Sequence, residues 1–206
     1  MKVMLINGSP HAQGCTYTAL SEVEGTLKKR GIETELYQIG TKPIAGCVAC
    51  MSCKKTGKCV QQDGVNEIVE RLDTIDAVVL GSPVYYAGPS GQLMAFLDRL
   101  FFTGGPRWRG KLGAAVISCR RGGATAAFDR LNKYFTISNM PVVSSQYWNQ
   151  VHGFTPDDVR KDEEGLQTMR TLGENMAWLL RCIEAGRQAG ISLPEYEPIT
   201  FTHFIR

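Results

Sequence analysis

Four cysteines that could act together lie within thirteen residues of the sequence: Cys47, Cys50, Cys53 and Cys59. Three of them are spaced at i, i+3 and i+6, and the fourth follows after five residues that include Gly57. Cysteine thiolates ligate both iron–sulfur clusters and structural zinc. Because glycine lets the backbone turn sharply, Gly57 could bring the fourth thiol back to the other three. The spacing therefore predicts a compact sulfur site.

This set of cysteines admits four kinds of chemistry: a [4Fe–4S] cluster, a zinc ion, free or redox-active thiols, and disulfides. Structural zinc usually binds two cysteine pairs about a dozen or more residues apart, whereas a tight run is closer to that of ferredoxins. Lys54, Lys55 and Lys58 would offset the negative charge of a thiolate-ligated cluster. The cysteines number seven in all, and this odd number disfavours a disulfide framework. The pattern favours an iron–sulfur cluster over zinc and leaves free thiols open.

A second candidate site is the loop GSPHAQGCT at positions 8–16, which joins a short apolar run to a helical pattern. Backbone N–H groups in such a loop, together with the N-terminus of the helix, can hold a phosphate. Ser9, His11 and Thr16 add side-chain donors. The loop contains neither GxGxxG nor Gly-Lys-Ser/Thr, so a single phosphate, as on a mononucleotide, fits better than a dinucleotide or a Walker-loop ligand. The alternative is an ordinary turn between strand and helix.

Three more loops carry residues that could contact a ligand. Residues 82–93 (SPVYYAGPSGQL) contain two adjacent tyrosines, and flat rings beside backbone amides suit a flat heteroaromatic ligand. Residues 118–125 (SCRRGGAT) pair two arginines, which could neutralise an anion, with two glycines that permit positive φ. Residues 147–153 (YWNQVHG) could wall a pocket through Trp148, Asn149 and His152. The respective alternatives are a tyrosine pair that packs on the neighbouring loop, a solvated arginine pair, and a loop with a structural role only.

These loops follow β-rich runs that alternate with helical patterns along the chain. The predicted strands are residues 2–7, 32–39, 76–82, 111–119 and 141–148, and the predicted helices are residues 16–30, 63–72, 90–102, 124–138 and 163–189. The alternation predicts a single three-layer α/β domain over residues 1–206, with a doubly wound, parallel, five-stranded sheet in the flavodoxin-like order 2-1-3-4-5. The cysteine loop (44–63) and a C-terminal arm (190–206) lie outside this pattern. Ligands of such sheets bind beyond the carboxyl ends of the strands, where the candidate loops lie.

The remaining three cysteines occupy different parts of this plan. Cys15, in the loop at positions 8–16, and Cys119, at the end of the fourth strand, are expected to lie beside the ligand. Cys182 is expected in the core face of the last helix.

Composition narrows the classes of function. The net charge of +3 and the pI of about 8.5 are too weakly basic for a nucleic-acid-binding protein. The first apolar run has only five residues before Asn7, too short for a signal peptide, and no apolar stretch approaches the ~18–20 residues that cross a bilayer. We therefore expect a cytoplasmic protein with no nucleic-acid or membrane partner, in a compartment where disulfides are rare.

Several segments together resemble the flavodoxin-like NAD(P)H-dependent FMN reductases. They are Gly8-Ser9-Pro10 with Thr16, Ser82-Pro83-Val84-Tyr85 with Leu93, and Asp98-Arg99. The pattern C-x2-C-x2-C-x5-C narrows the resemblance to the iron–sulfur flavoproteins of anaerobic prokaryotes. The resemblance covers roughly residues 1–185 of the chain.

The resemblance implies FMN held without a covalent bond, its phosphate on residues 9–16 and its ring on residues 83–88 and 118–123. The cofactor-binding residues that it implies are Ser9, His11, Gly14, Cys15, Thr16, Pro83, Val84, Tyr85, Tyr86, Ala87, Gly88, Ser118, Arg120, Arg121, Gly122 and Gly123. No catalytic acid or base is assigned, since electron transfer to a flavin does not obviously require one. The metal ligands would be the four clustered cysteines, if they hold a [4Fe–4S] cluster.

The activity that the resemblance implies is an FMN-dependent oxidoreductase. Electrons would come from NAD(P)H or a reduced ferredoxin and pass to a small-molecule acceptor. NAD(P)H would bind only transiently, because the chain lacks a dinucleotide fingerprint. The assembly would be a homodimer or homotetramer, with the cysteine loop near a partner subunit's flavin. The alternative is a flavodoxin-type electron carrier between protein partners, without a small substrate of its own.

Overall fold

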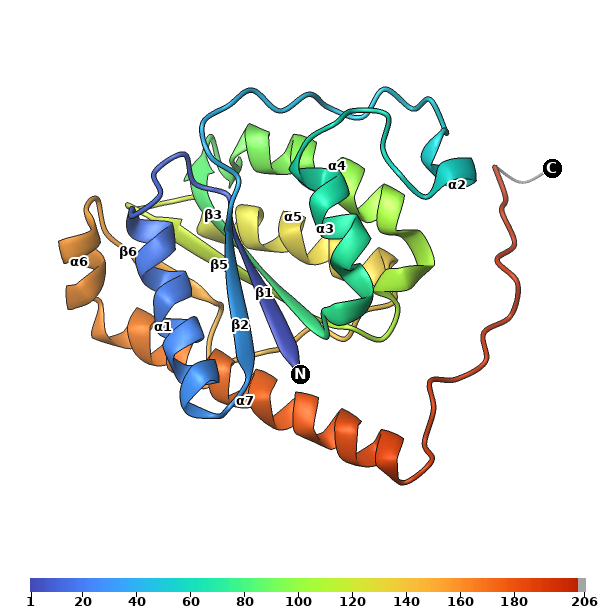
Figure 1. Ribbon diagram of the computed structural model, residues 1–206. Coiled ribbons are helices and arrows are strands. Elements are labelled where there is room, and N and C mark those ends of the chain that lie inside the picture. Colours follow the sequence, from blue (N-terminus) through green and yellow to red (C-terminus); the bar gives the residue numbers. More distant parts are fainter. Residues whose placement is uncertain (204–206) are drawn as a thin grey trace.

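Residues 1–203 are described by a computed structural model, in which five parallel strands form the main sheet (Figure 1). The strands are β1 (Lys2–Asn7), β2 (Glu33–Gln38), β3 (Ala77–Tyr85), β5 (Leu112–Cys119) and β6 (Gln150–His152), and their order across the sheet is β2-β1-β3-β5-β6. This is the predicted order 2-1-3-4-5, so the prediction of a doubly wound, flavodoxin-like sheet is confirmed. The central strands align in register, with Leu5 opposite both Leu36 and Val79, and Val79 opposite Ala114.

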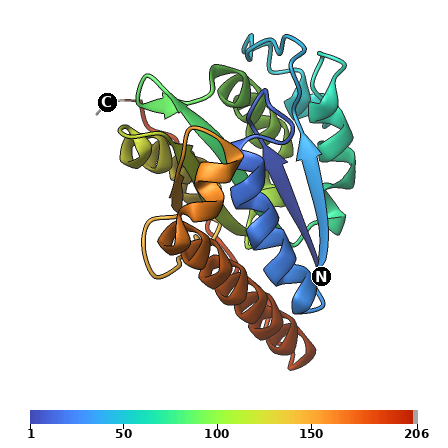
Figure 2. The same ribbon diagram turned by 90° about the vertical axis from the view of Figure 1, so that its left-hand side faces the viewer.

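Helices cover both faces of this sheet, as Figures 1 and 2 show. One face packs against α3 (Gly64–Arg71), α4 (Gly91–Gly104) and α5 (Ala124–Ile137), and the other against α1 (Cys15–Lys29), α7 (Glu163–Gln188) and the short α6 (Pro156–Lys161). Alternate residues of β3 point to opposite faces of the sheet. Val78 lies in the hydrophobic core beneath α3, α4 and α5, and Val79 lies in the core beneath α1, α6 and α7. Strands buried on both faces explain why β3 and β5 are almost continuously apolar.

The predicted position of the fifth strand, residues 141–148, is wrong. In the described chain this segment joins the sheet through a single bridge, from Gly113 to Val142, and the strand itself is Gln150–His152. The hydroxyl of Ser145 accepts a hydrogen bond from the Tyr147 N–H (3.3 Å) and lies 2.7 Å from Asn149 Oδ1. Because serine can satisfy nearby backbone and side-chain groups in this way, it offers the chain an alternative to the ladder of a strand.

Three short elements escape the sequence patterns. A two-residue strand, β4 (Gly88–Pro89), folds back on β3. One turn of helix, α2 (Cys53–Thr56), lies within the cysteine loop. The third element, α6, begins at a capping box formed by Thr155 and Asp158. α2 ends at Gly57 with φ of 70°, so the predicted turn at this glycine is confirmed. Two 3₁₀ turns, Leu72–Thr74 and Gly105–Trp108, complete the described elements.

The chain after α7 is the segment predicted as a C-terminal arm. Residues 191–203 form neither helix nor strand and run along the outside of the molecule (Figure 1), and residues 204–206 lie outside the described residues. Cys182 is exposed, so its predicted place in the helix core is wrong; α7 buries Met169, Leu172 and Met176 instead. Among residues 1–203, no helix combines the length and the apolar character needed to cross a membrane.

Candidate functional site

Polar side chains at the ends of two strands hold the loop between β1 and α1. The amide of Asn7, the last residue of β1, donates to Gln38 Oε1 (2.6 Å), and its Oδ1 accepts from the Ser9 N–H (3.1 Å). Gln38, the last residue of β2, donates to the Ser9 carbonyl (2.7 Å). Ser9 Oγ in turn accepts from the His11 N–H (3.1 Å). The sequence prediction misses Asn7 and Gln38, although a polar residue at the carboxyl end of a strand is the available signal.

Helices α1 and α5 begin at this edge of the sheet without a side-chain cap. Their N-cap residues are Gly14 and Gly123, and neither first turn carries an acidic residue. Helices α3, α4 and α7, in contrast, are capped by Asp63, Ser90 and Asp162. The first N–H groups of a helix have no partner within it, and the helix dipole adds partial positive charge. Both helix ends therefore favour an electron-rich ligand.

Hydroxyl groups join this loop to its neighbours. Ser90 Oγ donates to the Gly8 carbonyl (2.7 Å), which ties the start of α4 to the loop after β1. Thr16 Oγ1 and Ser118 Oγ lie 2.8 Å apart and are both buried, which ties α1 to the end of β5. The loops that the sequence predicts to bind the phosphate and the ring therefore meet at one edge.

The tyrosine loop is a tight hairpin between β3 and β4. Tyr85 pairs with Gly88, and the two residues between them, Tyr86 and Ala87, have φ of 49° and 60°. Positive φ at both central positions is the geometry of a type I′ turn, which glycine or asparagine usually occupies. The turn leaves the Tyr86 side chain fully exposed. Non-glycine residues held in this region store strain, which tends to persist at ligand sites.

Gly123 and Gly122 provide a matched test of how closely the loop after β5 approaches the turn between β3 and β4. A Cβ on Gly123, where φ is 91°, would lie 2.8 Å from Ala87 Cα, whereas a Cβ on Gly122 would meet nothing within 4 Å. A left-handed alanine costs about 1–2 kcal/mol before any clash. We expect Gly123→Ala to lower the midpoint of thermal unfolding by roughly 2–8 °C or more and to weaken ligand binding. Gly122→Ala should leave the thermal midpoint unchanged; equal falls of the thermal midpoint in the two variants would contradict the close approach.

The remaining predicted residues border the same edge. Pro83 and Val84 belong to the end of β3, and Arg120 and Arg121 are exposed on the loop after β5. Trp148 and His152 are exposed, whereas Asn149 is buried beside Ser145. The structure therefore brings Trp148 and His152, but not Asn149, to the surface.

Cys15 begins α1 and Cys119 ends β5, and the sulfur of each contacts a backbone carbonyl. Cys15 Sγ lies 3.8 Å from the Gly153 carbonyl, and burial raises the pKa of its thiol. Cys119 Sγ lies 3.0 Å from the Gly122 carbonyl. A hollow of about 430 Å³ opens beside Cys15, between residues 11–15 and the segment of Phe154 and Pro156.

The four clustered cysteines line one small cavity. Its volume is about 20 Å³, and Arg99 and Phe102 of α4 form its inner side. Cys47 and Cys50 are exposed, whereas Cys53 and Cys59 are partly buried. The space matches about one water molecule, so binding a larger group would require the exposed cysteines to move outward. Nevertheless, the chain folds so that all four predicted sulfur ligands face the same space.

A single metal ion and an iron–sulfur cluster require different arrangements. The ligands of zinc all contact one atom, at about 2.3 Å for sulfur, whereas the four cysteines of a [4Fe–4S] cluster each bind a different iron. Within residues 1–203, no three cysteine, histidine or carboxylate side chains are grouped as a single ion would require. The donors in the described lining are sulfur, without carboxylate or imidazole. An all-cysteine donor set fits a [4Fe–4S] cluster, and it equally fits the Cys₄ type of structural zinc site.

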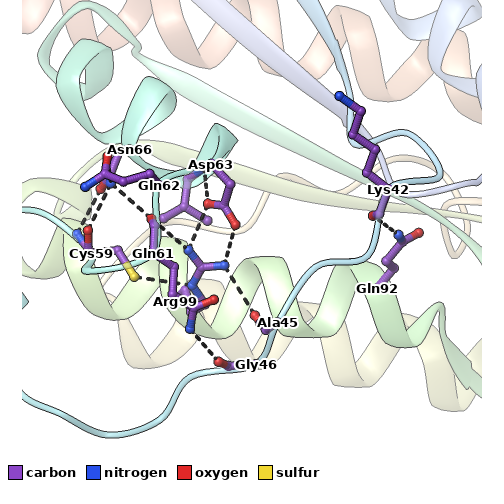
Figure 3. A network of polar contacts seen from close by, with 11 residues as sticks. Lys42, Ala45, Gly46, Cys59, Gln61, Gln62, Asp63, Asn66, Gln92 and Arg99 are labelled. Carbon is purple, nitrogen blue, oxygen red and sulfur yellow. Dashed lines mark hydrogen bonds and ion pairs between the residues drawn. The ribbon is translucent and has the colours of Figure 1, made fainter.

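Arg99 lies under the cysteine loop in a network that Figure 3 shows. Its side chain is 1% exposed, and its guanidinium donates to both carboxylate oxygens of Asp63 (2.6 and 2.8 Å). Burial disfavours the charge, but the bonds to Asp63 and Cys59 outweigh this effect and raise the pKa of Arg99. The sequence analysis includes Arg99 only as part of the motif Asp98-Arg99. Its position within an apolar helical stripe does not indicate that it bonds to Asp63 and Cys59.

Comparison with known proteins adds to this geometry. The family model described as NADPH-dependent FMN reductase matches residues 1–155. An iron–sulfur flavoprotein of Methanocaldococcus jannaschii is 35% identical over 89% of the chain and 100% of its own length, and one of Methanosarcina thermophila is 29% identical over 91% and 99%. The solved structure of an NAD(P)H:quinone oxidoreductase from Methanothermobacter marburgensis shares the fold, with a TM-score of 0.65 at 17% identity, over 85% of this chain and 96% of its own.

Proposed function

The chain belongs to the NADPH-dependent FMN reductase family, in its iron–sulfur flavoprotein subgroup, and from this premise we propose that it is an FMN-dependent oxidoreductase that passes electrons from NAD(P)H or a reduced ferredoxin to a small acceptor. The observation that carries the proposal is the meeting of two uncapped helix N-termini, α1 and α5, at one edge of the sheet. Bound FMN would supply reversible uptake of one or two electrons.

The residues of the chain would bind and orient this cofactor. The N–H groups of residues 9–16, with the hydroxyls of Ser9 and Thr16, would hold the phosphate. The hairpin at Tyr85–Gly88 and the loop at Ser118–Gly123 would flank the ring. The N-terminus of α5 at Gly123 would favour negative charge on the reduced ring. Tyr86, exposed at the tip of the hairpin, would shield the ring from water.

We propose that Cys47, Cys50, Cys53 and Cys59 hold a [4Fe–4S] cluster. The four cysteines line one shared cavity, which supports a common sulfur-ligated centre in this loop. The relatives named iron–sulfur flavoproteins point the same way. Lys54 and Lys55, exposed in α2, would offset the charge of the cluster.

Steady-state kinetics should be of the ping-pong type. No dinucleotide fingerprint supplies a separate NAD(P)H site, so the nicotinamide and the acceptor would use the same face in turn. Initial rates at several acceptor concentrations, plotted as double reciprocals, should give parallel lines. Intersecting lines would show that both substrates bind at once and would contradict this account.

The choice of electron acceptor in this assay distinguishes the proposed enzyme from the second candidate function, an electron carrier. Turnover of NAD(P)H with quinone or dye acceptors supports the enzyme, whereas turnover with ferredoxin alone supports the carrier. We further propose a single domain over residues 1–206, assembled as a homodimer or homotetramer in the cytoplasm. Light scattering of the flavin-loaded protein measures the mass of the assembly and so the number of subunits.

A further inference from the structure

Arg99 uses all of its hydrogen-bonding capacity around the cysteine loop. A guanidinium has five N–H donors in a fixed fork. Two contact Asp63, and others reach the carbonyls of Ala45 and Gln61 at 3.3 Å each, at the two ends of the loop. The remaining donor, Nε, lies 3.3 Å from Cys59 Sγ. A buried side chain with this pattern joins both ends of the loop and one sulfur to helix α4.

Asn66 anchors the backbone of Cys59, not its sulfur. It accepts from the Cys59 N–H (2.8 Å) and donates to the Cys59 carbonyl (3.0 Å), so it fixes the backbone. The bond to the sulfur comes from Arg99, as Figure 3 shows. Hydrogen bonds to cysteine sulfur are one of the factors that set the potential of an iron–sulfur centre. A cationic donor favours the reduced state, which carries more negative charge.

We propose that Arg99 is the positioning residue of the cysteine site: it closes the ends of the cysteine loop over Asp63 and directs its Nε–H at Cys59, so that a bound cluster is easier to reduce. The statement about reduction rests on the proposed [4Fe–4S] cluster; the statement about the loop does not. A purely structural ion pair between α4 and α3 is the competing explanation.

Three variants separate these explanations. Arg99→Lys keeps the charge but loses the fork. Arg99→Gln with Asp63→Asn removes both charges, leaves no unpaired buried ion, and retains an asparagine that can still cap α3. The matched control is Arg71→Gln with Glu35→Gln, because Arg71 also makes a two-pronged bond, to Glu35 at 2.8 and 3.0 Å, but touches no cysteine. FMN content and the thermal midpoint verify folding.

Limited trypsin digestion of the metal-free protein tests the loop. Lys54, Lys55 and Lys58 are exposed cleavage sites inside it, and mass spectrometry identifies cuts there. Cleavage reports the population of opened loop. Both Arg99 variants should be cut about tenfold faster at these lysines than the wild type and the control, as expected for the loss of about 1.4 kcal/mol of anchoring. Cleavage at the wild-type rate overturns the positioning role.

Potentiometric titration of the cluster-loaded protein, followed by electron paramagnetic resonance, tests the bond to sulfur. The equilibrium constant for reduction should fall about tenfold in both variants, or about 59 mV for one electron, while the control stays unchanged. An unchanged potential in both variants overturns the tuning role. A wild type that binds FMN but no iron contradicts the proposed cluster and with it the tuning role, and the digestion then decides the positioning role alone.

Discussion

Gly14→Asp is expected to weaken FMN binding about 100-fold or more while the protein still folds. Gly14 is the N-cap of α1, with φ of −84° and an extended backbone that any residue can adopt. Aspartate is a favourable N-cap, so its carboxylate would accept from the N–H groups that we assign to the phosphate. It would also place negative charge beside the phosphate, and unit charges about 4 Å apart repel by about 4 kcal/mol near a protein surface.

Gly14→Asn is the matched control for this change. A Cβ at this position lies 2.9 Å from His11 Cβ, so both variants displace His11 equally. Asparagine also caps the helix but carries no charge, and it should weaken binding much less. Riboflavin provides the second control, because it lacks the phosphate: its affinity should be similar in both variants. Fluorescence titration with FMN and riboflavin gives the four affinities. Equal FMN affinity in the aspartate and asparagine variants would place the phosphate elsewhere.

Cys59→Ser is expected to remove most of the iron while leaving FMN in place. A serine hydroxyl is a poor substitute for a thiolate, and even the loss of an outer partner of a metal ligand typically costs about 10–100-fold in affinity. We expect at least that loss in iron and sulfide content after anaerobic reconstitution. The flavin content should be unchanged, because Cys59 lies outside the loops assigned to FMN.

Cys182→Ser is the control for this loss. Cys182 is an exposed cysteine on α7, outside the lining of the sulfur cavity, so its replacement tests whether removing any thiol reduces iron uptake. Wild-type iron content in the Cys59 variant would exclude this cysteine from the ligand set. Loss of flavin together with iron would mean that the cysteine loop supports the FMN site directly.

The layered fold could be predicted from sequence because its signals are strong and local. Continuous apolar runs such as Ala77–Leu80 are typical of strands that are buried on both faces, and the helical stripes between them fix the connections. The last strand could not be placed in this way. Ser145 and Asn149 hold the preceding residues in a local turn, and hydropathy does not distinguish that turn from a strand.

The loops of the candidate site could be predicted from the sequence, but the residues that hold these loops in place could not. Glycine, serine and paired tyrosines mark the carboxyl edge, and topology alone brings them together. Asn7, Gln38 and Arg99 act through distant partners: Asn7 bonds to Gln38, 31 residues away, and Arg99 to Cys59, 40 residues away. No local pattern encodes such partners. The strained turn at Tyr86 and Ala87 likewise lacks the glycine that would have signalled it.

Anaerobic mixing of the FMN-loaded protein with NADH or NADPH tests the central claim most directly. The account predicts that at least one nicotinamide bleaches the visible flavin absorbance, and that a quinone added afterwards restores it. Flavin that neither nicotinamide reduces, in a protein that binds FMN with a one-to-one stoichiometry, would contradict an NAD(P)H-dependent activity and leave a reduced ferredoxin as the donor. Failure to bind FMN at all would contradict the proposed function itself.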